Sequence, residues 1–195
     1  MFDNVTLQAK HVRLEPLSFE HKVGICAAIK DGDLNDLFVT TVPNPENIDS
    51  FIQNALDMFD KGEGLAFATI DQSSNKVVGS TRFMCASTVH NKTEIGYTFI
   101  AKSFQKSAIN TQAKLLMLTH VFEILELNRV EFLTDFLNNT SRNAILRLGA
   151  KQEGILRNDR VMSNGRIRDS VMFSIIKNEW SGIKQNLEFK LKQYK

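Results

Sequence analysis

The residues best suited to chemistry lie at positions 105–110, where the chain reads Gln-Lys-Ser-Ala-Ile-Asn. The segment before them, Thr93–Ile100, is β-branched and aromatic enough to predict a strand. After them, apolar residues recur at helical spacing at Leu115, Leu118, Phe122 and Leu125. A loop that opens a helix presents unpaired backbone N–H groups beside the positive end of the helix dipole. The sequence therefore predicts a phosphate or pyrophosphate site at this loop.

A second strand and helix follow the first pair. Val130–Asp135 predicts a strand, and residues 138–141, Asn-Asn-Thr-Ser, lead into a helix whose apolar side includes Ile145 and Leu148. Gly149 stands just past that helix, as a left-handed C-cap requires. Further on, Asn164-Gly165 predicts a hairpin with a type I′ turn, whose return strand begins at Gly165 and ends near Trp180.

The N-terminal half predicts two helices, one capped by Ser18 and one that starts at Asn44-Pro45 and stops at Gly62. Its predicted strands are Val12–Leu17, Leu65–Ile70 and Val77–Cys85. Helices early, then antiparallel strands, then a strand-helix-strand unit indicate the mixed α+β class.

The composition is that of an ordinary globular protein, with 43% hydrophobic and 24% charged residues in a chain of 195. A net charge of +2 gives no electrostatic reason to expect nucleic acid as a partner. Cys26, Cys85 and the four histidines show no ligand spacing, so we expect no metal and reduced core thiols. No apolar stretch approaches the roughly 20 residues of a membrane span. We therefore expect a cytoplasmic domain that binds neither nucleic acid nor membrane.

Taken in order, these motifs resemble those of the GNAT superfamily of N-acetyltransferases. The loop keeps Gln105 of the family pattern Gln/Arg-x-x-Gly-x-Gly/Ala, with Ala108 and Asn110 at the positions of the small residues. The family segments Asp-x-x-Asn-x-x-Ser and Leu-Gly are matched by Asp135, Asn138, Ser141, Leu148 and Gly149. The C-terminal hairpin is similar to that of the branch named for ribosomal-protein N-terminal acetyltransferases.

The resemblance implies a single α+β domain over residues 1–195. Its expected sheet is mixed, mostly antiparallel and about six- to seven-stranded, flanked by helices and splayed at the centre. The splayed strands correspond to Thr93–Ile100 and Val130–Asp135. Residues 183–195 are expected to form a C-terminal helix, and the protein to be a monomer or homodimer.

Acetyl-CoA is the co-substrate that the resemblance implies, with no metal. Its pantetheine arm is expected along Thr98, Phe99 and Ile100, where a backbone N–H can meet the thioester carbonyl. Its pyrophosphate is expected on Gln105, Lys106, Ser107, Ala108, Ile109 and Asn110. The Asn138 amide is expected to bond the pantetheine. Because an alanine adopts a left-handed backbone poorly, the loop binds well only if Ala108 is right-handed.

Glu94 matches the strand glutamate that serves as general base, through water, in histone-type relatives. A structural carboxylate is the alternative. Another group of relatives carries its glutamate five residues before the motif asparagine, where this chain has Leu133. Ser141 is the candidate acid for the leaving thiolate, and a helix-capping serine is its alternative.

The acceptor is expected to be a primary amine, either a protein N-terminus or a small molecule. Arg82 is the candidate acceptor-binding residue, while Arg168-Asp169 fits either substrate recognition or a local structural pair. Aromatic residues of the early helices, either core or pocket, are Phe19, Phe38, Phe51 and Phe59. The alternative function is a regulatory module that binds acyl-CoA without turnover.

Overall fold

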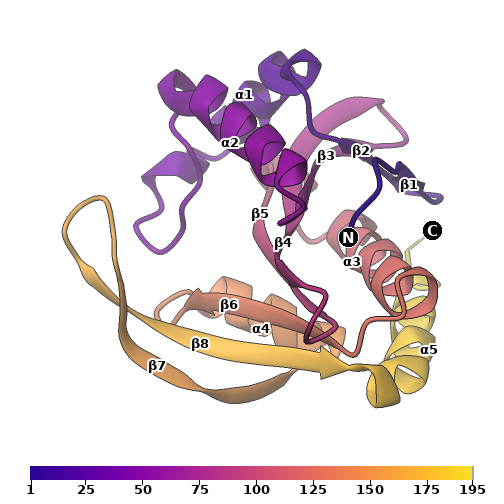
Figure 1. The fold of residues 1–195 in the computed structure, drawn as a ribbon. Helices are drawn as coiled ribbons and strands as arrows, with labels where there is room; N and C mark the ends of the chain where they lie inside the picture. Colours follow the sequence, from indigo (N-terminus) through magenta and orange to yellow (C-terminus); the bar gives the residue numbers. More distant parts are fainter. Residues whose placement is uncertain (195) are drawn as a thin grey trace.

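The computed structural model describes residues 1–194 and forms one eight-stranded sheet in the order β1-β2-β3-β4-β5-β6-β8-β7 (Figure 1). The strands are β1 Leu7–Gln8, β2 Val12–Pro16, β3 Leu65–Asp71, β4 Lys76–Ser87, β5 Lys92–Ile100, β6 Arg129–Asp135, β7 Lys151–Val161 and β8 Ile167–Ile176. The expectation of six to seven strands was one short. The added strand is β1, whose two residues pair with β2 and are too few to show a hydropathy pattern.

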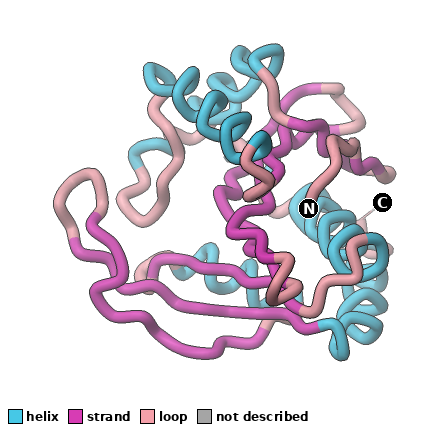
Figure 2. The backbone as a smooth tube through the Cα atoms, in the orientation of Figure 1, coloured by secondary structure: helices cyan, strands magenta, loops and turns pink. Residues whose placement is uncertain are grey.

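Every neighbouring pair of strands is antiparallel except β5 and β6, which are parallel. A parallel pair needs a long crossover, and here the helix α3, Ala108–Thr119, provides it. The pairing of β5 with β6 stops after Glu94↔Glu131, although both strands continue. From that point β6, β8 and β7 turn away from the rest of the sheet (Figures 1 and 2). The predicted splay at the centre of the sheet is confirmed.

Helices cover both faces of the sheet. On one face, α1 Lys22–Lys30 and α2 Ile48–Asp60 pack on small residues of β3, including Ala66 and Ala68. On the other, α3, α4 Asn139–Leu148 and α5 Trp180–Leu191 share a core with Leu65 and Phe67. Because neighbouring residues of β3 point to opposite cores, all of β3 is buried.

Shorter turns connect these elements. The 3₁₀ turns are Phe19–His21, Leu34–Asp36, Pro45–Asn47, Lys102–Phe104 and Lys177–Glu179, and a π turn at His120–Ile124 continues α3. Ser18 precedes the first of them, and Pro45 lies in the turn that leads into α2. Gly62, at φ +71°, follows α2 as predicted. Gly149, at φ +103°, is the predicted left-handed cap of α4.

Two boundaries near the C-terminus differ from prediction. The turn at Asn164-Gly165 is not type I′, because only Gly165 has a positive φ, +81°. Its N–H donates to Met162 O, which makes a three-residue connection with one left-handed glycine, and β8 begins at Ile167. The C-terminal helix α5 spans Trp180–Leu191 and starts three residues before the expected 183, since Trp180 and Leu187 both pack into the core. Of the expected helix 183–195, residue 195 lies outside the described residues.

We predict that Gly79→Ala destabilises the fold by about 1–3 kcal/mol. A Cβ at position 79 would lie 2.0 Å from the backbone oxygen of Phe99, and neither strand can move without breaking the ladder. Chemical denaturation would measure the change in the free energy of unfolding. Gly154→Ala is the matched control, because a Cβ there meets nothing within 4 Å. Equal stability of the two variants would contradict the close approach of β4 and β5.

Candidate active site

A β-bulge interrupts β5 just beyond its last pair with β6. Ser80 pairs with Phe99 and Arg82 with Gly96, so Tyr97 and Thr98 together face the single residue Thr81. Tyr97 has φ +48°, a left-handed conformation that a bulge imposes. The bulge turns the β5 backbone at the point where β6 has left it. Main-chain groups of Thr98, Phe99 and Ile100 therefore lie on the open side of the sheet.

The helix α3 begins close to the end of β5. Ser107 is its N-cap, and the Ser107 hydroxyl accepts a hydrogen bond from Ile109 N at 3.3 Å. Ala108 and Asn110 are both within the helix, so the condition that Ala108 be right-handed is met. The left-handed residue of the loop is Lys106, at φ +58°. Local sequence pointed to positions 108 and 110 for this role, because it could not show where the helix begins.

Glu94 lies on β5 at the junction with β6, and only 8% of its surface is exposed. Burial raises the pKa of the Glu94 carboxyl, and the charge of Glu131 raises it further. The positive charges of Arg160 and Arg168 and the neighbouring Cys85 thiol act in the opposite direction. The carboxyl is therefore easier to protonate than an exposed glutamate, which suits a group that takes up a proton.

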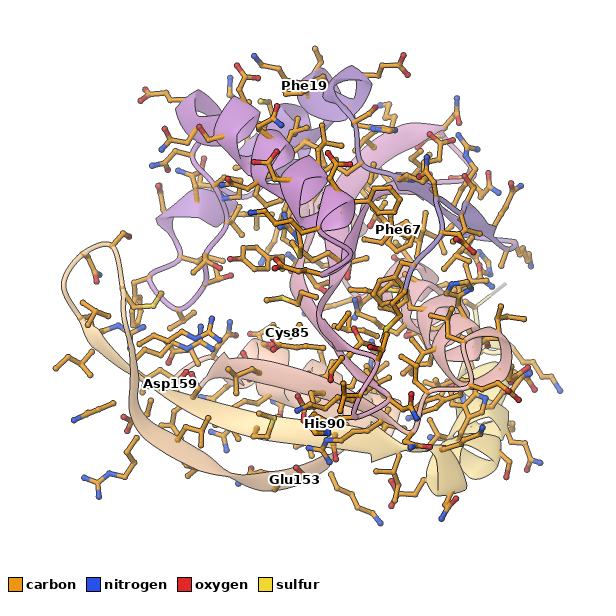
Figure 3. The ribbon with its side chains drawn as sticks, in the orientation of Figure 1. Phe19, Phe67, Cys85, His90, Glu153 and Asp159 are labelled. Atoms are coloured by element: carbon orange, nitrogen blue, oxygen red, sulfur yellow. The ribbon has the colours of Figure 1, made fainter. Side chains whose placement is uncertain are left out.

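A cleft of about 690 Å³ opens between α2 and the strands β4 and β5. Its lining residues are Asn54, Asp57, Met58, Lys61, Glu63, Arg82, Met84, Cys85, Ala86 and Tyr97. Glu94 is not among them, and Cys85, which touches Glu94, is. Figure 3 labels Cys85 in the space between β4 and the diverging β6. Cys85 is exposed, so the prediction of a core thiol was wrong for this residue, whereas Cys26 is half-buried and packs against the core beneath α1 and α2.

Arg82 contributes a buried positive charge to this cleft. Its guanidinium carbon lies 4.7 Å from the ring centre of Phe51 and 4.3 Å from that of Tyr97. Burial lowers the pKa of Arg82 to about 10, and its Nε and Nη2 atoms have no hydrogen-bond partner among the described residues. Two aromatic faces thus hold the charge in place without neutralising it. Phe51 of α2 is a buried core residue that holds Arg82 from behind and does not itself line the cleft.

Lys114 of α3 was not identified from the sequence. It is 4% exposed, and its Nζ atom donates hydrogen bonds to the hydroxyls of Thr81, at 2.7 Å, and Thr98, at 2.8 Å. Burial lowers the pKa of this lysine to about 7. A single lysine on an apolar helix face usually extends its ammonium group to water. Only the tertiary packing shows that the ammonium group of Lys114 stays buried.

Asn138 and Ser141 lie at the start of α4, beyond the end of β6. The Asn138 Oδ1 atom accepts a hydrogen bond from Ser141 N at 2.9 Å, so the asparagine, and not the serine, caps the helix. Its Nδ2 atom donates to Val39 O at 3.3 Å, which leaves one N–H of the amide for another acceptor. Ser141 is half-buried, and no hydrogen bond of its hydroxyl is found within residues 1–194.

Arg166, just before β8, and Arg168 and Asp169, on β8, bind residues outside this strand or further along it. Arg168 donates to Ser170 at 2.8 Å, and Asp169 accepts from Asn158 N at 2.8 Å, so these neighbours bind separate groups rather than each other. Arg166 binds Asp135 and donates to Phe38 O at 3.2 Å. Together with the Asn138–Val39 bond, this contact holds the segment between α1 and α2 against the diverging arm of the sheet.

Within residues 1–194, no group of three or more histidine, cysteine or acidic side chains is arranged to hold a metal ion. No helix in the same part of the chain has the length and apolar character needed to cross a membrane.

Comparison with known proteins places this geometry in a family. The model of the "Acetyltransferase (GNAT) domain" family matches residues 11–151. A GCN5-related N-acetyltransferase from Brucella melitensis superimposes with a TM-score of 0.85 at 29% identity, over 97% of this chain and 86% of that one. RimJ of Mycobacterium smegmatis, solved with CoA-disulfide, shares the fold with a TM-score of 0.82 at 19% identity, over 96% and 95% of the two chains.

Curated relatives agree. YdaF of Bacillus subtilis (strain 168), described as a candidate ribosomal N-acetyltransferase, is 43% identical over 96 residues, which are 49% of this chain. That match spans about half, 51%, of the length of YdaF. The N-acetyltransferase p20 of Bacillus licheniformis, itself uncharacterised, is 25% identical over 91% of this chain and 99% of its own length. With its splayed strands, its bulged β5 and its helix-opening loop, the chain belongs to the GNAT family of acetyltransferases, whose members use acetyl-CoA.

Proposed function

We propose that the protein transfers an acetyl group from acetyl-CoA to a primary amine by direct attack of the amine on the thioester. The observation that carries the proposal is the opening between β5 and β6, which starts at Glu94↔Glu131 and lies beside the N-terminus of α3. An extended pantetheine arm can add to the free edge of β5 as a further strand. The reacting carbon would then lie close to Glu94, at the point where the strands part.

The cofactor would be held in two places. The first turn of α3 offers unpaired N–H groups to the pyrophosphate, with the Ser107 and Lys106 side chains next to them. Thr98, Phe99 and Ile100 offer main-chain groups to the pantetheine, and a backbone N–H of the bulge would polarise the thioester carbonyl. One such donor is typically worth about 3 kcal/mol in the transition state. Asn138 would bond the arm from the α4 side with its remaining N–H.

Glu94 would act as general base and Ser141 as general acid. The amine nitrogen attacks the carbonyl carbon while its proton passes, through water, to the Glu94 carboxylate. The tetrahedral intermediate then expels the thiolate, which takes a proton from the Ser141 hydroxyl. A positioned base accounts for roughly 10²–10⁴-fold in rate. The raised pKa of Glu94 supports this role, and the half-buried hydroxyl of Ser141 at the start of α4 supports the other.

The acceptor would enter through the cleft between α2 and β4–β5. Asp57 and Glu63 on its wall favour a positively charged amine, whereas Arg82 favours a carboxylate or carbonyl oxygen. An amino acid and a peptide N-terminus carry both features. A protein N-terminus is consistent with the description of YdaF.

A second candidate function is a regulatory module that binds acyl-CoA without turnover. One observation favours it: Cys85 lines the cleft while Glu94 does not, so the carboxyl reaches the acceptor only through water or after Cys85 moves. Release of the CoA thiol that depends on an added peptide, polyamine or amino acid would identify a transferase, whereas binding of acetyl-CoA without such release would identify a regulatory module.

We predict that Ser107→Ala weakens acetyl-CoA binding several-fold and lowers the free energy of unfolding by about 1 kcal/mol, because the loop loses its cap and a hydroxyl. Calorimetric titration with acetyl-CoA and a denaturation curve measure the two effects. Ser181→Ala on α5, an exposed serine remote from the loop, should change neither. Unchanged affinity in Ser107→Ala would remove this residue from the cofactor site.

We predict that Glu94→Gln lowers kcat by about a hundredfold and abolishes the acidic limb of the pH–rate profile. Since the folded-state pKa of Glu94 is raised, its ionisation opposes folding above the unfolded value of 4.5. The variant should therefore be at least as stable as the parent at pH 7. The exposed Glu188→Gln is the control for charge. A parental kcat with a parental pH profile would exclude Glu94 as the base.

We predict that Arg82→Met raises KM for the acceptor about tenfold and leaves the affinity for acetyl-CoA unchanged. Methionine can fill the space between Phe51 and Tyr97 but removes the charge, and a tenfold change corresponds to about 1.4 kcal/mol of binding energy. Steady-state kinetics measures KM, and Lys61→Met, an exposed charge on the same cleft, shows the effect of net charge alone. Equal KM values for Arg82→Met and the parent would place Arg82 outside the acceptor site.

A further inference from the structure

Among residues 1–194, the buried lysine beneath the bulge, Lys114, has no counter-charge. Its hydrogen-bonded neighbours are the neutral hydroxyls of Thr81 on β4 and Thr98 on β5, and the Met117 sulfur of its own helix lies 3.9 Å from Nζ. No acidic side chain among residues 1–194 forms an ion pair with it, and burial alone shifts its pKa. No charged side chain on α3, β4 or β5 contributes to the shift of the Lys114 pKa.

Such a lysine is a poor choice for stability. Removing an ammonium group from water without a counter-ion is costly, and the two hydroxyls return only part of that free energy. Methionine has a similar length and would fill the same space between α3 and the sheet without this penalty. The lysine therefore works against folding at a position where an apolar residue would serve, which is typical of a group retained for function.

Its position indicates what that function is. Lys114 lies six residues after Ala108, about 9 Å along α3 from the turn proposed to hold the pyrophosphate. Thr98, which it contacts, is the second residue of the bulge and is exposed on the open side of β5. The Thr98 hydroxyl also lies 2.8 Å from that of Thr81. One ammonium thus ties α3 and β4 to the backbone that the thioester carbonyl would meet.

We propose that Lys114 is a positioning residue for acetyl transfer, which in its protonated form fixes the Thr98 bulge and adds positive potential beneath the carbonyl oxygen of acetyl-CoA. The inference rests on the function proposed above. As the amine attacks, the carbonyl π pair moves onto oxygen, and it returns as the carbon–sulfur bond breaks. Lys114 keeps its proton throughout, and its charge favours the electron-rich intermediate. Because the pKa of Lys114 is about 7, this effect fades as the pH rises above neutrality.

The carbonyl carbon of bound acetyl-CoA reports the effect directly. With [1-¹³C]acetyl-CoA and no acceptor, we expect the ¹³C resonance in the parent protein to lie downfield of free acetyl-CoA and to move toward the free position between pH 6 and 9, with an apparent pKa near 7. In Lys114→Met the resonance should lie near the free position and should not titrate. Thr98→Val keeps the lysine but breaks its contact, and should reduce the displacement as well.

Three further measurements complete the test. Lys114→Met should lower kcat about tenfold, less than the loss of a direct donor, with the Kd for acetyl-CoA unchanged. It should be at least as stable as the parent at pH 7, and it should lose the rise in stability that a buried lysine produces as the pH climbs from about 7 toward its unfolded value of 10.5. Lys10→Met, an exposed lysine between β1 and β2, is the control for charge and should behave as the parent.

Two results would overturn the proposal while leaving acetyl transfer intact: a ¹³C resonance that does not titrate in an active parent protein, or a titration that persists in Lys114→Met and disappears in Glu94→Gln. If Lys114→Met does not fold, Thr98→Val and Lys114→Arg decide, since arginine keeps the charge but must abolish the titration near neutrality. A parent protein that binds no acetyl-CoA would instead refute the proposed function, and this inference with it.

Discussion

The structure depends on a junction of three residue pairs between β5 and β6, Lys92↔Arg129, Thr93↔Val130 and Glu94↔Glu131. They are the whole parallel link between the two arms of the sheet. More pairs would close the opening, and a main-chain hydrogen bond from Asn128 N to Asn91 O, at 2.7 Å, supports the junction at its other end. The junction carries its own support, because Glu131 binds both Lys92 and Arg129. The opening therefore lies within one continuous sheet, and these ion pairs stabilise its closed end.

The same helix serves both ends of the proposed cofactor site. Its first turn is capped by Ser107 and directs N–H groups outward, and its second and third turns bring Lys114 beneath the bulge. Because a helix is rigid over this length, the phosphate end and the thioester end are held at a fixed separation. The family fold explains the helix N-terminus at the phosphate end. The hydrogen bond from Lys114 to Thr98 adds a link from the same helix to the thioester end.

Three ionisable groups near the opening are buried without full compensation: Glu94, Arg82 and Lys114. Burial favours the neutral form of each group, so it raises the pKa of Glu94 and lowers the pKa values of Arg82 and Lys114. Burying each of these charges opposes folding at neutral pH. Burial of apolar side chains in the two cores on the faces of the sheet offsets this cost. Groups of this kind gather where a protein has a use for a perturbed proton or an unpaired charge.

The sequence by itself determined the order of the elements and most of their ends. Thr93–Ile100, a helix after the loop 105–110, and the α4 segment between Asn138 and Gly149 were predictable because periodicity and a left-handed glycine act within a few residues, whereas the first residue of the helix after the loop was not. The junction, the bulge at Tyr97, the left-handed Lys106 and the burial of Lys114 were decided only by the tertiary structure. Each depends on which residue lies opposite in a strand or a helix far away in the chain, and no local pattern records that partner. The chemistry of Glu94 and Lys114 belongs to this second group, because the pKa of a side chain is set by what surrounds it.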